Sequence, residues 1–386
     1  MKSIWFITNI PTPYRVHFFR ALNAELVKRE LRLQVSFMAL TESGRNWRFC
    51  RGEELGFPYA VHSGVHPRLA GVNIHLNAGI LARAAFCRVD VTIIGGSWLI
   101  PSTALVPLLR KKGICLYWSE SNIDSSRYKG KATSLARQFV LSRFDGFCVP
   151  NQRALDWVRT YCPAVEEKLV IRLPNLVDEA LYRGEVETRR QMKEELRNKN
   201  GLRRDDRVLL CPIRLLERKG LGAFLNALKD CKFREVTILV AGNGPERAQL
   251  EALSRHMRSV RTRFLGYCNE EKMLELYALA DILLLPSFQD PNPLCVIEAC
   301  HAGLPLLISS FVGNRAEALN EGINGWSFNP FEPFSIVKAT ESALATPSDQ
   351  LEVMGNASSE IAKENFSTTK TVNHLIDCLQ SISINS

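Results

Sequence analysis

The sequence predicts an α/β protein made of two doubly wound domains, each with a parallel sheet, that face each other across a cleft. In both halves of the chain, short runs rich in β-branched and aromatic residues alternate with amphipathic helical patterns. This alternation is typical of parallel βαβ units. It breaks once, in a charged stretch over residues 178–206. With 386 residues, of which 46% are hydrophobic and 23% charged, the chain is long enough for two globular domains with a core each.

The first domain is expected over residues 1–177. Its strands are predicted from apolar runs at residues 3–8, 33–40, 89–96, 115–120, 145–150 and 168–175. Helices are predicted where apolar residues recur at helical spacing. They are expected at residues 15–30, 102–113, 132–144 and 152–162.

A linker with one exposed helix is expected over residues 178–206, because "EVETRRQMKEELRNKNG" is rich in charge and ends at a glycine, a common residue at helix ends. The second domain is expected over residues 207–365. A C-terminal helix over 366–386 is expected to pack back on the first domain. The strands of the second domain are expected at 207–215, 235–244, 260–267, 281–287 and 304–309, and its helices at 221–231, 246–257 and 270–280.

The positive charge of the chain lies in its first half. Residues 1–177 hold 24 Lys and Arg against 12 Asp and Glu, and the other residues hold 25 against 28, so the net charges are +12 and −3. This excess either serves solubility or draws that half to an anionic partner such as phosphate, a lipid surface or nucleic acid. No nucleic-acid-binding motif accompanies the charge, so nucleic acid is not expected as a partner.

The protein is expected to be cytoplasmic. Its 11 cysteines are scattered without a C-x-x-C pair, which is typical of reduced, buried thiols rather than of disulfides or a zinc site. The first ten residues are too short an apolar run for a secretory signal peptide. Residues 91–109 are long and apolar enough to span a bilayer, but Gly95-Gly96 and Pro101 divide them into a strand and a helix.

Three features of the second half converge on one edge of its sheet. Arg214 and Lys219 lie in the loop after one strand. Gly242 and Gly244 follow the next strand, where glycine lets a ligand approach the backbone. The stretch "SFQDPNPLCVIEAC" ends a later strand and begins a helix, with Pro293 near its first turn. Two cations and a free helix N-terminus at one sheet edge suit a diphosphate.

Glu298 lies one helical turn beyond this helix N-terminus, inside an apolar run. An unpaired buried carboxylate is costly, so Glu298 needs a partner. A carboxylate can accept hydrogen bonds from the two hydroxyls of a ribose, which makes Glu298 a candidate for binding the nucleoside. The alternative is a buried acid paired with Arg or Lys.

These motifs resemble those of the retaining glycosyltransferases of the large GT4 group (glycosyl transferases group 1), which have two Rossmann-like domains in the GT-B fold. The resemblance covers the whole chain and is strongest over residues 207–330. It rests on an R-x4-K pair at Arg214 and Lys219, on "AGNGPE", on Asp290-x7-Glu298 in place of E-x7-E, on "PNLVD", on "AGLP" and on "VGNRAEALNEGINGWSF" with Glu317.

The resemblance implies a donor site in the second domain and an acceptor site in the first. Arg214 and Lys219 would hold the donor diphosphate and serve catalysis as cations. Glu298 would bind the ribose, and Asp290 would reach the transferred sugar. The backbone amides that would cap a phosphate are those of Leu294, Cys295 and Val296.

The sequence departs from the family pattern at several positions. The first acid of the E-x7-E element is Asp290, one methylene shorter than the usual Glu. At the first-domain strand end where many relatives carry His, the sequence reads "YWSESN". Glu120 there would orient the acceptor or accept its proton, unless it is an ordinary loop acid. The other acceptor-binding candidates are Tyr14, Arg15 and His17, which begin a helix, and Asn122; His17 suits helix packing equally well.

Together these features predict a retaining glycosyltransferase that moves a sugar from a nucleoside-diphosphate sugar to a hydroxyl acceptor. The acceptor is expected to be a saccharide, most simply a lipid-linked one in cell-surface polysaccharide assembly, because a basic half suits peripheral attachment to an anionic inner membrane. No D-x-D motif stands at a strand end and no nucleophilic constellation is evident, so neither a metal nor another cofactor is expected. Fixed cations and amides would stabilise the leaving group.

Two alternatives stay open. One is a non-catalytic subunit that binds a sugar nucleotide, for which Asp290 and the absent His are arguments. The other is a sugar-nucleotide epimerase with the GT-B fold, which would need a cluster of acid and base residues that the sequence does not show.

Overall fold

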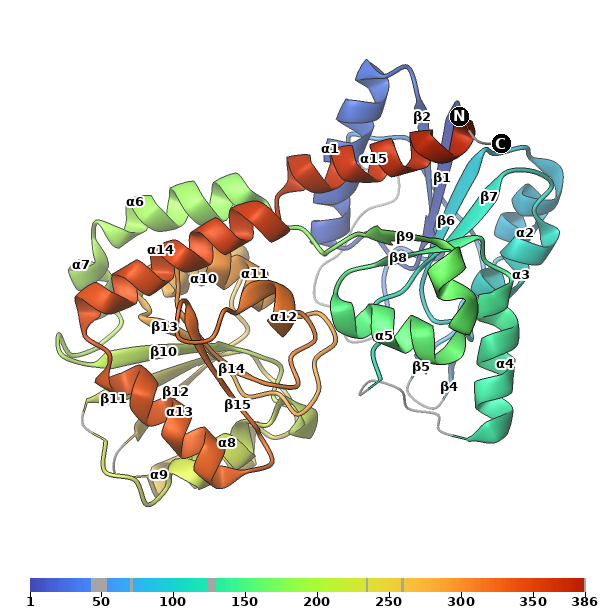
Figure 1. Ribbon diagram of the computed structural model, residues 1–386. Helices are drawn as coiled ribbons and strands as arrows, with labels where there is room; N and C mark the ends of the chain where they lie inside the picture. The colour runs from blue at the N-terminus through green and yellow to red at the C-terminus, as the bar shows by residue number, and fades with distance from the viewer. Residues whose placement is uncertain (43–53, 70–71, 124–129, 234, 258–259, 385–386) are drawn as a thin grey trace. The chain divides into compact units, whose positions relative to one another are not determined.

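The computed structural model describes the whole chain except residues 43–53, 70–71, 124–129, 234, 258–259 and 385–386. The chain forms two compact units (Figure 1). Unit 1 comprises Met1–Leu176 with Thr368–Ser386, and unit 2 comprises Val177–Ser367. Each unit is built on its own parallel sheet, which confirms the expected pair of α/β domains. The cleft between them stays a prediction.

The sheet of unit 1 has seven strands in the order β3-β2-β1-β6-β7-β8-β9, and all neighbours are parallel. Its strands are nearly continuous apolar runs because helices cover both faces. The strands are β1 (Ser3–Thr8), β2 (Arg32–Phe37), β3 (Tyr59–Val61), β6 (Val91–Gly95), β7 (Ile114–Trp118), β8 (Gly146–Val149) and β9 (Leu169–Arg172), beside a small hairpin of β4 (Arg68–Leu69) and β5 (Val72–Asn73).

Two layers of helices cover this sheet. On one face, α1 (Pro13–Lys28) packs against α15 (Thr368–Ile384), and Arg29 hydrogen-bonds Asp377 and Asn373 of α15, each at 2.8 Å. The C-terminal helix therefore lies on the first sheet. The other face is covered by α2 (Ala78–Phe86), α3 (Pro101–Leu109), α4 (Lys131–Ser142) and α5 (Gln152–Tyr161), with a 3-10 turn at η1 (Pro163–Glu167).

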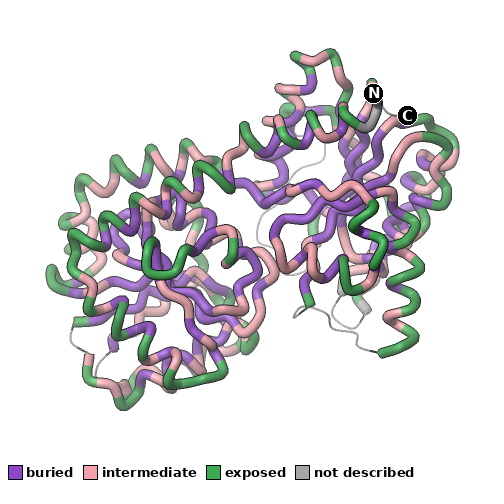
Figure 2. Tube along the Cα trace, in the orientation of Figure 1, coloured by how far each residue is buried: buried purple, intermediate pink, exposed green. Residues whose placement is uncertain are grey.

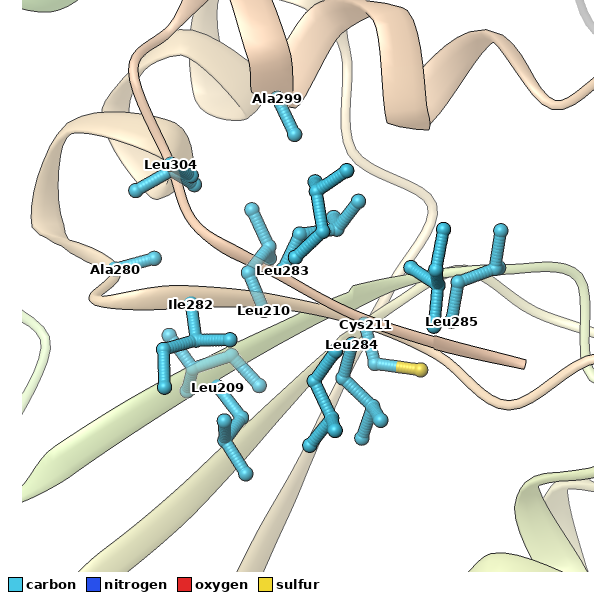
Figure 3. Packing of buried hydrophobic residues seen from close by; sticks show 14 of the residues in the cluster. Leu209, Leu210, Cys211, Ala280, Ile282, Leu283, Leu284, Leu285, Ala299 and Leu304 are labelled. Carbon is cyan, nitrogen blue, oxygen red and sulfur yellow. The ribbon is translucent and has the colours of Figure 1, made fainter. Parts of the chain in front are cut away.

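The sheet of unit 2 has six parallel strands in the order β12-β11-β10-β13-β14-β15. Its central strands are apolar on both faces, as Figure 3 shows for Leu209, Leu210 and Leu283. Figure 2 shows the same arrangement along the trace, with buried strands beneath helices whose outer faces are exposed. The strands are β10 (Arg207–Pro212), β11 (Val236–Ala241), β12 (Val260–Gly266), β13 (Ile282–Leu285), β14 (Leu306–Ser309) and β15 (Gly325–Phe328).

Helices also form two layers on the second sheet. One layer holds α8 (Leu221–Leu228), α9 (Arg247–Arg255) and α13 (Pro333–Ala345), with the short turn η3 (Glu217–Lys219) leading into it. The other holds α10 (Glu270–Leu279), α11 (Leu294–His301), α12 (Arg315–Ala318) and α14 (Ser348–Asn365).

The charged segment 178–206 belongs to unit 2 and packs on α10. In place of one helix it forms a π-helical turn η2 (Leu181–Glu185), α6 (Val186–Arg190) and α7 (Lys193–Lys199). The break at Met192 turns the next helix so that Lys193 and Arg197 reach Asp281, at 2.8 and 2.6 Å. Asp281, just before β13, thus anchors the helix that follows the break.

The apolar stretch 91–109 divides as expected into β6 and α3. Within the part of the chain that the structure describes, no helix combines the length and the apolar character needed to cross a membrane. The ten cysteines in this part are all free.

Candidate active site

The carboxyl edge of the unit 2 sheet contains one place where the strand order reverses. β11 and β12 lie on one side of β10, while β13, β14 and β15 lie on the other. Ligands of doubly wound sheets bind beyond the strand ends at such a place. The loops that leave β10 and β13 meet there, and they carry Arg214, Lys219 and Asp290.

Lys219 and Asp290 form an ion pair between these two loops. Each side chain is only 12% exposed, so water screens the pair weakly. The backbones of the two loops are also joined, because the N–H of Gln289 donates to the carbonyl of Arg218 at 3.2 Å. Two residues predicted for the donor therefore lie together, and each neutralises the other. An ammonium has three donors, so Lys219 can still contact an anionic ligand.

Arg214 lies in the same loop, and its side chain is exposed. The glycine loop after β11 packs directly on the backbone around it. A Cβ at Gly242, where φ is +152°, would lie 1.8 Å from the carbonyl oxygen of Ile213, and one at Gly244 would lie 2.2 Å from that of Leu215. The two glycines thus let the loop after β11 pack closely on the loop after β10. This packing fixes the backbone that carries Arg214.

Helix α11 begins at the same edge with an uncapped N-terminus. Pro293 precedes it, no described side chain caps its first turn, and that turn contains no acid. The side chain of Asn314 donates to the carbonyl of Pro293 at 3.1 Å and so fixes the start of the helix. The free amides here are those of Leu294, Cys295 and Val296. Such an N-terminus favours an anion.

The loop after β14 supports the site through residues that local sequence patterns did not indicate. A Cβ at Gly313 would lie 1.7 Å from the carbonyl oxygen of Pro291. The N–H of Gly313 also donates to the carbonyl of Asp290 at 2.8 Å. Gly313 and Asn314 both stand in the quoted stretch "VGNRAEALNEGINGWSF". Their partners lie more than 20 residues earlier, which one sequence does not reveal.

Glu298 is half-buried in α11 and receives two hydrogen bonds from phenols. The hydroxyl of Tyr277 donates to Oε2 at 2.6 Å, and that of Tyr182 makes a second hydrogen bond. Burial raises the pKa of Glu298, and the two tyrosine hydrogen bonds lower it, with a net rise above the ordinary value. Among the described ion pairs, none joins Glu298 to Lys or Arg.

In unit 1, Arg15 extends from α1 across the carboxyl edge of the sheet. Its guanidinium donates to Oγ1 of Thr8, the last residue of β1, and lies 3.6 Å from Glu120 Oε1 after β7. It also stacks on Trp118, with the guanidinium carbon 5.1 Å from the ring centroid. Burial lowers the pKa of Arg15, but Tyr14 and the neighbouring carboxylates raise it above the ordinary value. The structure therefore brings together Arg15 and Glu120, which were both predicted for the acceptor side.

A polar chain next to Arg15 was not anticipated. His75 is 1% exposed, and its Nε2 lies 3.0 Å from Glu42 Oε1 while its Nδ1 lies 2.9 Å from His66 Nδ1. Asn9 also donates to Glu42, at 3.2 Å. These residues come from loops far apart in the sequence, so no local spacing indicates the cluster. Carboxylate, amide and imidazole groups at this edge can hydrogen-bond hydroxyls.

The remaining acceptor candidates do not all lie near Arg15. Tyr14 lies beside Arg15, with its ring centroid 5.7 Å from the guanidinium carbon. Asn122 is fully buried in the loop after β7. His17 faces another way, because its Nε2 lies 3.1 Å from Thr368 Oγ1 at the start of α15. The structure thus uses His17 between two helices and does not bring it to the Arg15 group.

Comparison with known proteins shows which family this chain resembles. Residues 192–360 match the family described as glycosyl transferases group 1. An uncharacterized glycosyltransferase, MJ1607, from Methanocaldococcus jannaschii is 29% identical over 172 residues, 44% of each chain. The lipopolysaccharide glucosyltransferase WaaG from Escherichia coli is 28% identical over 191 residues, 49% of this chain and 50% of that one. The chain spans about half the length of these curated relatives.

Solved structures extend the likeness to the whole chain. Anabaena Alr3699/HepE, solved in complex with UDP and glucose, superposes with a TM-score of 0.72 over 99% of this chain and 100% of that chain, at 17% identity. The structure of WaaG gives a TM-score of 0.63 over 97% and 99% of the two chains, at 16% identity. Likeness at these identities establishes the two-domain GT-B fold.

Proposed function

We propose that this chain transfers a sugar from a nucleoside-diphosphate sugar to a hydroxyl acceptor with retention at the anomeric carbon. Its residues 192–360 match the glycosyl transferases group 1 family, and its two units have the GT-B fold. The observation that carries this proposal is the convergence at one sheet edge of Lys219, Arg214 and the free N-terminus of α11. That combination of two cations and uncapped amides suits a diphosphate and its developing charge.

The residues divide the work as follows. Lys219, Arg214 and the first amides of α11 stabilise the leaving diphosphate, and Glu298 accepts the ribose hydroxyls. Asp290, already in contact with Lys219, reaches the sugar. The relative solved with UDP and glucose is a protein of the same fold, which supports a nucleotide-sugar donor of that chemical class.

Retention follows if the acceptor attacks the face that the diphosphate leaves. The bond from the anomeric carbon to the diphosphate oxygen breaks, the bond to the acceptor oxygen forms on the same face, and the acceptor proton passes to the departing diphosphate. No protein nucleophile and no metal is required in this scheme. Glu120, held by Arg15, would orient the acceptor hydroxyl.

We further propose a lipid-linked saccharide as acceptor, reached from the inner face of a membrane. α3 and α4 cover the same face of the first sheet, and both expose large apolar side chains, namely Leu105, Leu108, Leu109, Leu135 and Phe139 at 39–66%. Lys111 and Lys112 follow α3 and are exposed. Apolar residues beside cations favour reversible binding to an anionic leaflet. WaaG, a relative, is a lipopolysaccharide glucosyltransferase.

The catalytic proposal is tested with the purified chain, a panel of UDP-, ADP- and GDP-sugars, and an extract of cell lipids and oligosaccharides. We expect release of one nucleoside diphosphate with formation of a glycoside of the donor's anomeric configuration, read by NMR, and unchanged in EDTA. Inverted product would contradict retention, and loss of activity in EDTA would contradict metal independence.

A non-catalytic sugar-nucleotide-binding subunit is the second candidate. It is favoured by the Asp290–Lys219 ion pair, which holds the carboxylate proposed to contact the sugar while Lys219 can still bind a diphosphate. Binding of a sugar nucleotide without hydrolysis or transfer to any acceptor in the extract would support this candidate.

The membrane proposal is tested by flotation with phosphatidylglycerol vesicles. Phe139→Ser should reduce binding. The matched control is Phe334→Ser in unit 2, which removes an 80% exposed phenylalanine and should leave binding unchanged. High salt should release the protein, because exposed charge is screened. If the protein binds neither neutral nor anionic vesicles at low salt, this part of the proposal is refuted.

A further inference from the structure

We propose that Tyr182 and Tyr277 are positioning residues that hold the Glu298 carboxylate in place to accept the ribose hydroxyls of the donor. This inference rests on the proposed function and adds two residues to it that no sequence motif singled out.

The three residues come from three different elements of unit 2. Tyr182 lies in η2, Tyr277 in α10 and Glu298 in α11. Tyr277 is fully buried and Tyr182 is 8% exposed. Their rings meet edge to face with centroids 5.7 Å apart, so each phenol supports the other. The two hydroxyls then converge on one carboxylate, with Tyr277 Oη at 2.6 Å from Oε2.

The chemistry of the donors explains why phenols suit this place. Lys or Arg at this position would neutralise the carboxylate and compete with a ligand. A phenol donates one hydrogen bond and leaves the negative charge in place. An ionised carboxylate has about four acceptor sites. Two tyrosines occupy two of them, which leaves two for the adjacent hydroxyls of one ribose.

The surroundings make the two hydroxyls necessary. Glu270 of α10 lies close enough to raise the pKa of Glu298 further, and the Cys295 thiol stands on the same helix. Burial raises this pKa most, and the phenols are the groups that lower it. The nearest cation of η2, Arg183, is directed to His301 Nδ1 at 3.0 Å and to Glu179. Without the phenols, Glu298 would bind a proton more readily and lose its acceptor capacity.

The test compares a nucleoside diphosphate with its 2′,3′-dideoxy counterpart by calorimetry, for whichever of UDP, ADP and GDP binds the wild-type chain. The ratio of the two affinities isolates the ribose hydroxyls. Tyr277→Phe and Tyr182→Phe should each lower this ratio by roughly three- to tenfold, and Glu298→Gln should lower it at least as much. Tyr117→Phe removes a buried phenol hydrogen bond in unit 1 and should leave the ratio unchanged.

The pH profile of the same ratio gives a readout that a purely structural role would not move. Titration of the phosphates cancels in the ratio, so its fall on the acid side reports protonation of Glu298. Removing a phenol should move this fall to higher pH. Two tyrosine variants are made so that the test still works if one of them does not fold. Thermal unfolding shows which variants are folded.

The outcomes are distinct. The positioning role would be overturned if a folded tyrosine variant bound both ligands equally more weakly than wild type. It would also be overturned if the fall of the affinity ratio at low pH did not shift. Either result would leave the glycosyltransferase proposal standing. If no nucleoside diphosphate binds the wild-type chain, the proposed function and this inference fall together.

Discussion

Asp290→Asn should tighten binding of the free nucleoside diphosphate while it slows sugar transfer. In the structure the carboxylate of Asp290 contacts Lys219, and both side chains are 12% exposed, so an effective dielectric constant of about 20 applies. A phosphate that contacts the other side of Lys219 would lie roughly 7 Å from the carboxylate. At that separation two like charges repel by about 2 kcal/mol.

The substitution removes this repulsion but also frees the Lys219 side chain, which costs roughly 0.5–1 kcal/mol in ordering on binding. The net gain of about 1–1.5 kcal/mol corresponds to roughly tenfold tighter binding. Isothermal titration with UDP, or with whichever nucleoside diphosphate binds, measures it directly. Transfer should fall, because the amide no longer offers a charged acceptor to the sugar.

Asp230→Asn is a matched control. It removes an 88% exposed acid next to Lys229, away from the carboxyl edge, and affinity should change by less than twofold. Weaker binding by Asp290→Asn, or an affinity equal to that of the control, would refute the view that Asp290 and the diphosphate compete for Lys219.

Three further perturbations test other parts of the site and the fold. Arg214→Ala should weaken binding of the nucleoside diphosphate about ten- to a hundredfold, through loss of a charge-assisted contact; unchanged affinity in calorimetry would remove Arg214 from the site. Gly313→Ala should lower the thermal unfolding temperature, because a Cβ would lie 1.7 Å from a carbonyl oxygen, whereas Gly184→Ala, with open space around it, should not. Asp281→Asn should lower the free energy of unfolding by about 3 kcal/mol at pH 7. Burial raises the pKa of Asp281, but two paired cations lower it more. This contribution is therefore present above about pH 4 and is lost as the pH falls through the lowered pKa. In urea denaturation, the difference in unfolding free energy between variant and wild type should shrink as the pH falls below about 4, and a difference that stays constant throughout the acid range would contradict the assignment.

Local patterns were sufficient to predict the fold class. Parallel strands buried on both faces need apolar runs, and the helices between them need one apolar face, so each βαβ unit is visible within about 30 residues. The same patterns indicated which loops follow strands. Arg214 and the start of α11 could therefore be assigned to one sheet edge by sequence pattern alone. Local patterns did not predict the helix break near Met192, after which Lys193 and Arg197 pair with the distant acid Asp281.

Which side chains pair within the site depends on the tertiary structure and cannot be predicted from local sequence patterns. Lys219 contacts Asp290 because β10 and β13 are neighbours, although two other strands lie between them in the sequence. Tyr182 and Glu298 are more than 100 residues apart and meet through the packing of η2 and α11.

The acceptor side shows the same limit of local information. The spacing of Tyr14, Arg15 and His17 placed all three at the start of one helix, but residues at successive helical positions point in different directions. Arg15 reaches Glu120 across the sheet, whereas His17 turns to Thr368 on a helix from the other end of the chain. Hydrophobic periodicity is a local property, so the residues that begin helices and end strands can be predicted from the sequence alone. Which of them meet depends on strand order and helix packing, which only the folded chain establishes.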